Sequence, residues 1–112
     1  MIKTKAEILA ELPSMTEAEY DTQVKSFILD LRSKISMLQA ATSRKAFNEL
    51  MSITHRVRSA AINLRLENIV SLCSTILNNV RTTPDLMLLA ELERQLLVEM
   101  NNVDRDQIKA AP

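Results

Sequence analysis

The sequence contains no glycine and no tryptophan, and its 112 residues include only three prolines, two phenylalanines and one tyrosine. β-Rich folds use glycine in their turns and favour aromatic and β-branched residues in their strands, so this composition argues against one. The lack of glycine also excludes the glycine-rich loops that hold phosphate groups or dinucleotides in many enzymes. The composition therefore favours a compact all-α domain.

Cysteine and histidine are also scarce, with one of each. One histidine and one cysteine cannot supply a zinc ligand set, and we expect no metal and no bound cofactor. The single thiol, Cys73, lies among leucines and isoleucines and is predicted to be a small core residue. The formal net charge is zero, with 14 basic and 14 acidic residues, so we expect a protein partner and neither nucleic acid nor membrane.

Long hydrophobic runs are absent as well. No stretch approaches the roughly 20 apolar residues that span a bilayer. The charged segment at residues 1–7 lacks the apolar run of a signal peptide. We therefore expect a cytoplasmic protein with one domain over residues 1–112 and a core at about 16–103.

Apolar spacing predicts a short helix over residues 5–12, which Pro13 ends, followed by four long helices. Thr16 and Glu19 form a capping-box pattern that opens a helix ending near Ala41. Thr42 or Ser43 is then expected to cap a second long helix as far as Leu64. Short connections between the long helices predict an antiparallel up-and-down four-helix bundle.

The third long helix is predicted from Leu66 to Arg81. For the last helix, Thr83 is the expected cap and Pro84 the expected first residue, with apolar positions to Val103 and a polar, frayed tail from Asp104. Acidic pairs such as Glu91 with Glu93 have no pattern typical of acid–base partners and are expected to be surface charge.

His55 lies in the middle of the second long helix. At about 100° per residue it is well over 90° from the centre of the apolar stripe, so we expect its ring to face solvent. The same geometry gathers Met51, Arg58, Ser59 and Ile62 around it. An exposed imidazole beside a cation, a small residue and two apolar side chains is typical of a docking surface with a nucleophile at its centre.

The run from His55 to Cys73 resembles the signature of histidine-containing phosphotransfer (HPt) domains. In that family an aliphatic residue follows the histidine at +2, a basic residue at +3, small residues at +4 to +6 and an aliphatic residue at +9. The corresponding residues here are Val57, Arg58, Ser59, Ala60, Ala61 and Leu64. A leucine-rich helix follows, and the helix order extends the resemblance over about residues 16–103.

The resemblance implies that His55 accepts a phosphoryl group from a phosphoaspartate. Arg58 would stabilise the charge on that group and Ser59 would leave access to the ring. Met51 and Ile62 would contact the partner. The implied partners are the receiver domain of a response regulator and a hybrid histidine kinase; Mg²⁺ would belong to the receiver, and the chain would act as a monomer.

Two positions depart from the family pattern. Ser59 and Arg65 stand where the family often has glycine, at +4 and +10 from the histidine. An alternative is therefore a degenerate HPt-like adaptor or inhibitor that binds a kinase or response regulator without phosphotransfer. Two plainer interpretations also stay open: Met51 and Ile62 could form the rim of the core, and the bundle could serve only to oligomerise.

Overall fold

The computed structural model describes residues 4–110 of the chain, and the side chains of residues 4–106. Within this range the protein is helical and has no strand, which confirms the all-α prediction. The elements in chain order are α1 (Lys5–Glu11), α2 (Glu17–Ser43), α3 (Phe47–Asn63), α4 (Glu67–Arg81) and α5 (Leu86–Ala110).

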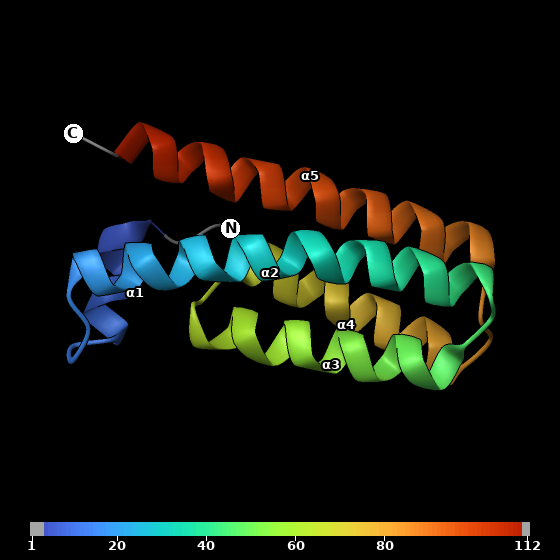
Figure 1. The fold of residues 1–112 in the computed structure, drawn as a ribbon. Helices are drawn as coiled ribbons and strands as arrows, with labels where there is room; N and C mark the ends of the chain where they lie inside the picture. Colours follow the sequence, from blue (N-terminus) through green and yellow to red (C-terminus); the bar gives the residue numbers. More distant parts are fainter. Residues whose placement is uncertain (1–3, 111–112) are drawn as a thin grey trace.

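The four long helices lie lengthwise beside one another, and α1 sits at one end, next to the start of α2 (Figure 1). The described chain measures 43 × 22 × 21 Å. α2 packs against α3 and α5, and α4 also packs against α3 and α5. Consequently α3 and α4 form one side of the molecule, and α2 and α5 form the opposite side.

The core runs along the interior between these four helices. Apolar residues recur at spacings of three and four, so each helix buries one stripe, and burial of each large aliphatic side chain contributes about 1.5–3 kcal/mol. The largest fully buried apolar side chains come from all four long helices: Leu31, Leu38, Leu50, Ile69, Ile76, Leu89, Leu96 and Met100. Cys73 is fully buried too, as predicted.

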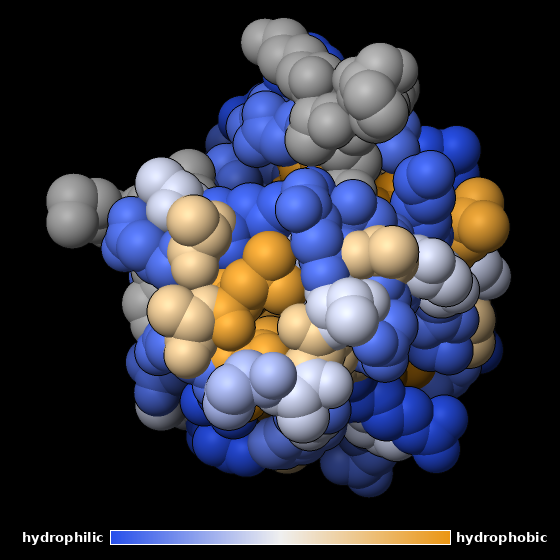
Figure 2. All heavy atoms as spheres, turned by 90° about the vertical axis from the view of Figure 1, so that its left-hand side faces the viewer, coloured by the Kyte–Doolittle hydropathy of each residue, from blue (hydrophilic) through white to orange (hydrophobic). Residues whose placement is uncertain are grey.

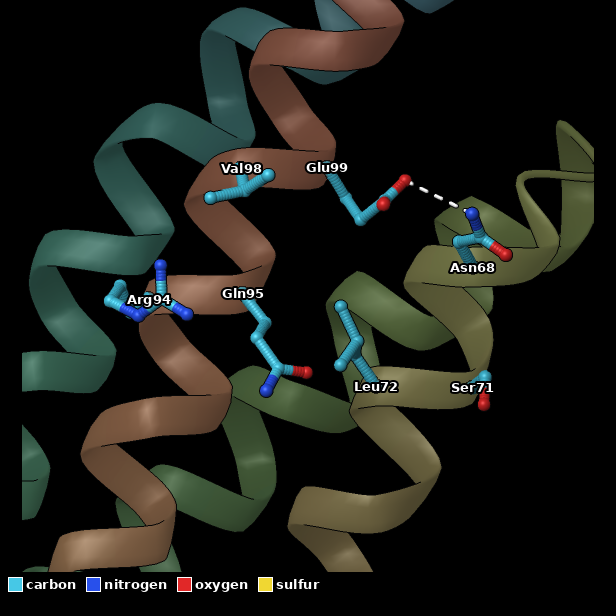
Figure 3. Close-up of a pocket in the computed structure, with 7 residues that line it drawn as sticks. All are labelled: Asn68, Ser71, Leu72, Arg94, Gln95, Val98 and Glu99. Atoms are coloured by element: carbon cyan, nitrogen blue, oxygen red, sulfur yellow. Dashed lines mark hydrogen bonds between the residues drawn. The ribbon is translucent and has the colours of Figure 1, made fainter.

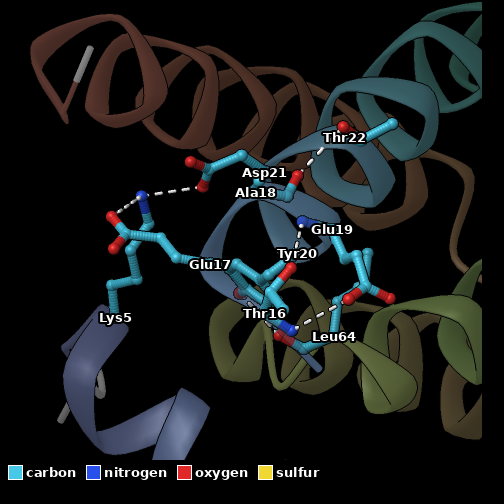
Figure 4. A network of polar contacts seen from close by, with 9 residues as sticks. All are labelled: Lys5, Thr16, Glu17, Ala18, Glu19, Tyr20, Asp21, Thr22 and Leu64. Carbon is cyan, nitrogen blue, oxygen red and sulfur yellow. Dashed lines mark hydrogen bonds and ion pairs between the residues drawn. The ribbon is translucent and has the colours of Figure 1, made fainter. Parts of the chain in front are cut away.

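The start of α2 has the predicted capping box. Glu19 N–H donates to Thr16 Oγ1 at 3.1 Å, and Thr16 N–H donates to Glu19 Oε1 at 3.3 Å (Figure 4). Lys5 of α1 forms ion pairs with Glu17 and Asp21 of α2, at 3.2 and 2.7 Å. These contacts attach the short helix to the first turns of α2.

Tyr20 ties the start of α2 to the connection between α3 and α4. Its hydroxyl donates to the carbonyl oxygen of Leu64 at 2.8 Å, and both residues are buried (Figure 4). Burial raises the pKa of the Tyr20 phenol, so the hydroxyl remains a donor at neutral pH. The bond satisfies a carbonyl at the end of α3, where helix geometry leaves acceptors without an intrahelical donor.

The two connections that flank α3 each contain a residue with a left-handed backbone. Lys45 has φ 57° and Arg65 has φ 59°. Glycine adopts this conformation most readily, but the sequence has none, so basic residues occupy both positions. The break predicted between Leu64 and Leu66 is confirmed, and Arg65 provides the turn.

Three predicted helix boundaries were wrong. α2 continues to Ser43, so Thr42 and Ser43 do not cap α3, and Ala46 precedes α3 without a side-chain cap. At α5 the capping oxygen comes from Asp85, whose Oδ1 accepts from the backbone N–H groups of Met87 and Leu88, both at 3.1 Å. Pro84 therefore lies before the helix and not at its first position.

The last helix is longer than predicted. α5 extends to Ala110, seven residues past Val103, so the polar segment after the apolar stripe is also helical. Residues 111 and 112 of the expected frayed tail lie outside the described residues. The stripe itself is confirmed, with Leu89, Leu92, Leu96 and Met100 buried.

The end of the molecule beside α1 is apolar at its centre and hydrophilic around it (Figure 2). Leu9, Leu12, Met15 and Leu66 are partly buried and pack against the core.

Among the described residues, no helix has the length and apolarity needed to cross a lipid bilayer.

Candidate functional site

His55 projects from the outer face of α3 and is exposed, as predicted. The stripe on the opposite face is buried: Leu50, Thr54, Val57 and Ala61. Thr54 is the polar member of that stripe. Its buried hydroxyl donates to the Leu50 carbonyl oxygen at 2.7 Å, so the hydroxyl has a hydrogen-bond acceptor inside the core. The helix therefore holds the imidazole on a rigid, packed support.

The cation that contacts His55 is Arg81. Its Nη2 lies 2.9 Å from Nε2 of the ring. A guanidinium can only donate hydrogen bonds, so Nε2 is the acceptor and the ring proton is on Nδ1. Arg81 is the last residue of α4, and the pairing of α3 with α4 brings it to the ring.

Sequence reasoning missed Arg81. It lies 26 residues beyond His55, outside the local pattern at +2 to +9. The available signal was a basic residue in the last turn of the following helix, a position that basic side chains favour for helix stability alone. Only the packing of α3 on α4 separates the two interpretations.

Arg58, the predicted phosphate-stabilising residue, is directed elsewhere. Its Nε donates to Ser74 Oγ at 2.8 Å, across the seam between α3 and α4, and the residue is partly buried. Arg58 thus lies on the same seam as Arg81, but the structure holds its guanidinium on α4 and not on the imidazole.

Arg58 also lies near Cys73. Burial raises the pKa of the Cys73 thiol to about 12, and the nearby Arg58 charge lowers it by less. A thiol with such a pKa is uncharged at neutral pH and unreactive. Cys73 is therefore a packing residue.

The other three predicted site residues differ in exposure. Ser59 is exposed on α3, one turn beyond His55. Ile62 is an exposed apolar side chain, with 37% of its surface accessible. Met51 is partly buried and packs against the core, so it belongs to the core rim as well as to the surface near His55.

A cavity of about 330 Å³ lies between α4 and α5, away from these residues (Figure 3). Asn68 Nδ2 donates to Glu99 Oε2 across it at 3.2 Å. None of the predicted site residues lines it; the lining residues are Asn68, Ser71, Leu72, Arg94, Gln95, Val98 and Glu99. Among the described residues, no group of three or more histidine, cysteine, aspartate or glutamate side chains could hold a metal ion.

Glu93 corrects the prediction that the α5 acids are surface charge. It is only 2% exposed, and its Oε2 accepts from the Thr42 hydroxyl at 2.5 Å. Burial raises the pKa of the Glu93 carboxyl, and the Thr42 hydrogen bond partly opposes this. By contrast, the exposed Glu91 pairs with Arg94, and its pKa falls to about 2.

Comparison with known proteins adds no assignment: no family model, no curated protein and no solved structure matches the chain.

Proposed function

We propose that the chain is an HPt-type phosphotransfer protein in which His55 carries a phosphoryl group between receiver-domain aspartates. In this proposal the four long helices form an antiparallel up-and-down bundle that acts as a cytoplasmic monomer. The partners are a hybrid histidine kinase and the receiver domain of a response regulator. The supporting observation is the exposed His55 ring, with a guanidinium at Nε2.

The proposed reaction uses the Nε2 lone pair. It attacks the phosphorus of a phosphoaspartate, the N–P bond forms, and the P–O bond to the aspartate breaks. The carboxylate leaves with that electron pair, and the Nδ1 proton stays on the ring or passes to water. Mg²⁺ on the receiver domain would offset charge on the phosphoryl oxygens.

Arg81 takes the role that the sequence pattern assigned to Arg58. Its guanidinium lies where a phosphoryl group on Nε2 would be attached, so the side chain must turn from the nitrogen to the phosphoryl oxygens during transfer. A guanidinium can bind two such oxygens at once. Arg58, held by Ser74, then contributes positive charge at longer range.

The test uses purified receiver domains that carry ³²P on aspartate, each mixed with the chain. We expect an acid-labile label on the wild type and none on His55→Gln. Arg81→Gln should slow transfer about 100- to 1000-fold, as expected for loss of one donor to the developing charge, and Arg58→Gln should slow it less. Arg94→Gln, on α5, is the control and should transfer at the wild-type rate.

Absence of label on the wild type across the panel, or equal label on His55→Gln, would refute the proposal. Circular dichroism of each variant shows whether a lost label reflects lost structure. A larger loss in Arg58→Gln than in Arg81→Gln would reverse the roles assigned to the two arginines.

The same Arg81 contact favours a second function, that of an HPt-like adaptor or inhibitor without phosphotransfer. Arg81 occupies the lone pair that the reaction needs. In an adaptor this contact would be permanent, so His55→Gln would bind a kinase or receiver domain as tightly as the wild type does. Retained binding without any label would establish that function.

A further inference from the structure

The charge of this neutral chain is divided between two sides of the molecule. Residues 44–82, which contain α3, α4 and their flanking connections, carry a formal charge of +4 and are called the α3/α4 side below. They include two acids, Glu49 and Glu67, and six basic residues: Arg44, Lys45, Arg56, Arg58, Arg65 and Arg81. The rest of the chain holds the other eight basic and twelve acidic residues, a formal charge of −4.

The packing turns this sequence asymmetry into a spatial one. α3 packs against α4 and α2 against α5, so the basic segment forms one side of the molecule (Figure 1). His55 and Arg81 lie on that side. Across its two short axes the whole molecule measures 22 and 21 Å.

The local partners of the cations also differ between the two sides. On the α3/α4 side Arg44 forms an ion pair with Glu49, but three other guanidinium groups donate to uncharged acceptors: Arg58 to Ser74 Oγ, Arg65 to the Ile62 carbonyl oxygen and Arg81 to His55 Nε2. Outside this side Arg105 donates to the uncharged Asn102 Oδ1, and three cations form ion pairs with acids: Lys5 with Glu17 and Asp21, Lys34 with Asp30, and Arg94 with Glu91. Neutral acceptors leave the field of a guanidinium uncancelled.

Because salt screens distant charges, an approaching partner interacts mainly with the charges on the side of the molecule that it faces. The Debye length is about 8 Å at physiological ionic strength, less than half the thickness of the molecule. A protein that approaches the α3/α4 side is therefore attracted by the local positive charge, although the whole chain is neutral.

We propose that the α3/α4 side docks a partner protein with a net-acidic surface, and that this charge orients the partner toward His55 before contact. The inference deepens the proposed phosphotransfer, because it specifies the charge of the partner's docking face. A protein fits better than nucleic acid, since the exposed apolar side chain of Ile62 lies on this side and the sequence pI is about 6.6.

The first test needs no natural partner. Poly-L-glutamate is added to ¹⁵N-labelled chain in 0.05 M NaCl, and amide shifts are mapped by NMR. We expect shifts over residues 44–82 that vanish in 0.5 M NaCl, and shifts over α2 and α5 with poly-L-lysine. Shifts spread evenly, or centred on α2 and α5 with poly-L-glutamate, would overturn the proposal.

The second test measures the second-order rate of phosphotransfer from whichever receiver domain labels the chain. Arg56→Glu changes the charge of the α3/α4 side by two units, and Arg56 is exposed next to His55. Its rate should fall about 5- to 10-fold in 0.05 M NaCl and about twofold or less in 0.5 M NaCl. Lys25→Glu makes the same change in charge at an exposed position of α2, and its rate should stay within about twofold of the wild-type rate.

Each other result contradicts the inference in its own way. Equal rates for Arg56→Glu and Lys25→Glu would show that charge does not orient the partner. Tighter binding of a thymidine 20-mer or of phosphatidylglycerol vesicles than of poly-L-glutamate in 0.15 M NaCl would indicate nucleic acid or membrane. Low-salt self-association lost in Arg56→Glu would indicate a second copy. If no receiver labels the chain, the phosphotransfer proposal fails, and the poly-L-glutamate map still decides the docking surface.

Discussion

The buried carboxyl of Glu93 predicts an unusual dependence of stability on pH. Its burial raises its pKa above the ordinary value of 4.5, so the folded protein binds this proton more tightly than the unfolded chain does. The stabilising effect of proton binding is therefore complete below the ordinary pKa and is lost as pH rises through the raised one. Glu93→Gln removes this titration and should gain stability relative to the wild type as pH rises.

The expected size follows from two opposing contributions. Removing a carboxylate from water costs several kcal/mol, and a hydrogen bond to a charged group, here from the Thr42 hydroxyl at 2.5 Å, returns about 1.5–3 kcal/mol. The difference leaves about 1–2 kcal/mol of pH-dependent destabilisation in the wild type at neutral pH. The gap in unfolding free energy between Glu93→Gln and the wild type should thus change by that amount between pH 4 and pH 8.

Urea unfolding followed by circular dichroism at 222 nm measures this gap at each pH. A change of about 1 kcal/mol corresponds to roughly 4 °C in Tm for a domain of this size, so thermal scans provide a second measurement. Glu91→Gln is the matched control on the same helix. Its partner Arg94 lowers the pKa of Glu91 to about 2, so the wild type should lose its advantage over Glu91→Gln as pH falls, the opposite slope.

A gap that stays constant from pH 4 to pH 8 would refute the reasoning about Glu93. So would a gap that moves in the same direction for both variants. Either result would mean that the Glu93 carboxyl is hydrated in solution and titrates like a surface group.

Three further changes test the local structure, each by urea unfolding. Tyr20→Phe removes the donor to the buried Leu64 carbonyl and should cost about 1–2 kcal/mol; an unchanged midpoint would mean that water replaces the hydroxyl. Thr16→Ala removes the side-chain acceptor of the capping box with Glu19 and should cost about 1 kcal/mol, against no loss if the first turn frays anyway. Lys45→Gly relieves a left-handed backbone at φ 57° and should stabilise the protein by about 1 kcal/mol, whereas destabilisation would show that unfolded-chain entropy outweighs that relief.

Local sequence rules predicted most of the helical framework. Repeating apolar positions located the long helices, and the capping box marked the start of α2. Each of these signals depends only on residues that are a few positions apart in the sequence. The boundaries failed where competing local choices were nearly equal. Thr42 was a plausible cap by sequence, but in the structure its hydroxyl bonds to Glu93, 51 residues away.

The candidate site divides in the same way. The helical period placed His55 on the exposed face and the stripe through Leu50 on the buried face, as the structure confirms. The same period put Arg58 one turn from the ring but could not show where its long side chain would bond. Its contact with Ser74 and the contact of Arg81 with His55 both cross between helices.

The approximate positions of the helices, the exposed imidazole and the division of charge along the chain could be read from the residues alone, because each depends on the period of one helix or on a count of residues. The cation that contacts Nε2, the burial of Glu93 and the position of the basic segment on one side of the molecule could not, because they follow from how the helices pack. These features depend on contacts between residues 16 to 51 positions apart, and the packing of whole helices against one another brings them together.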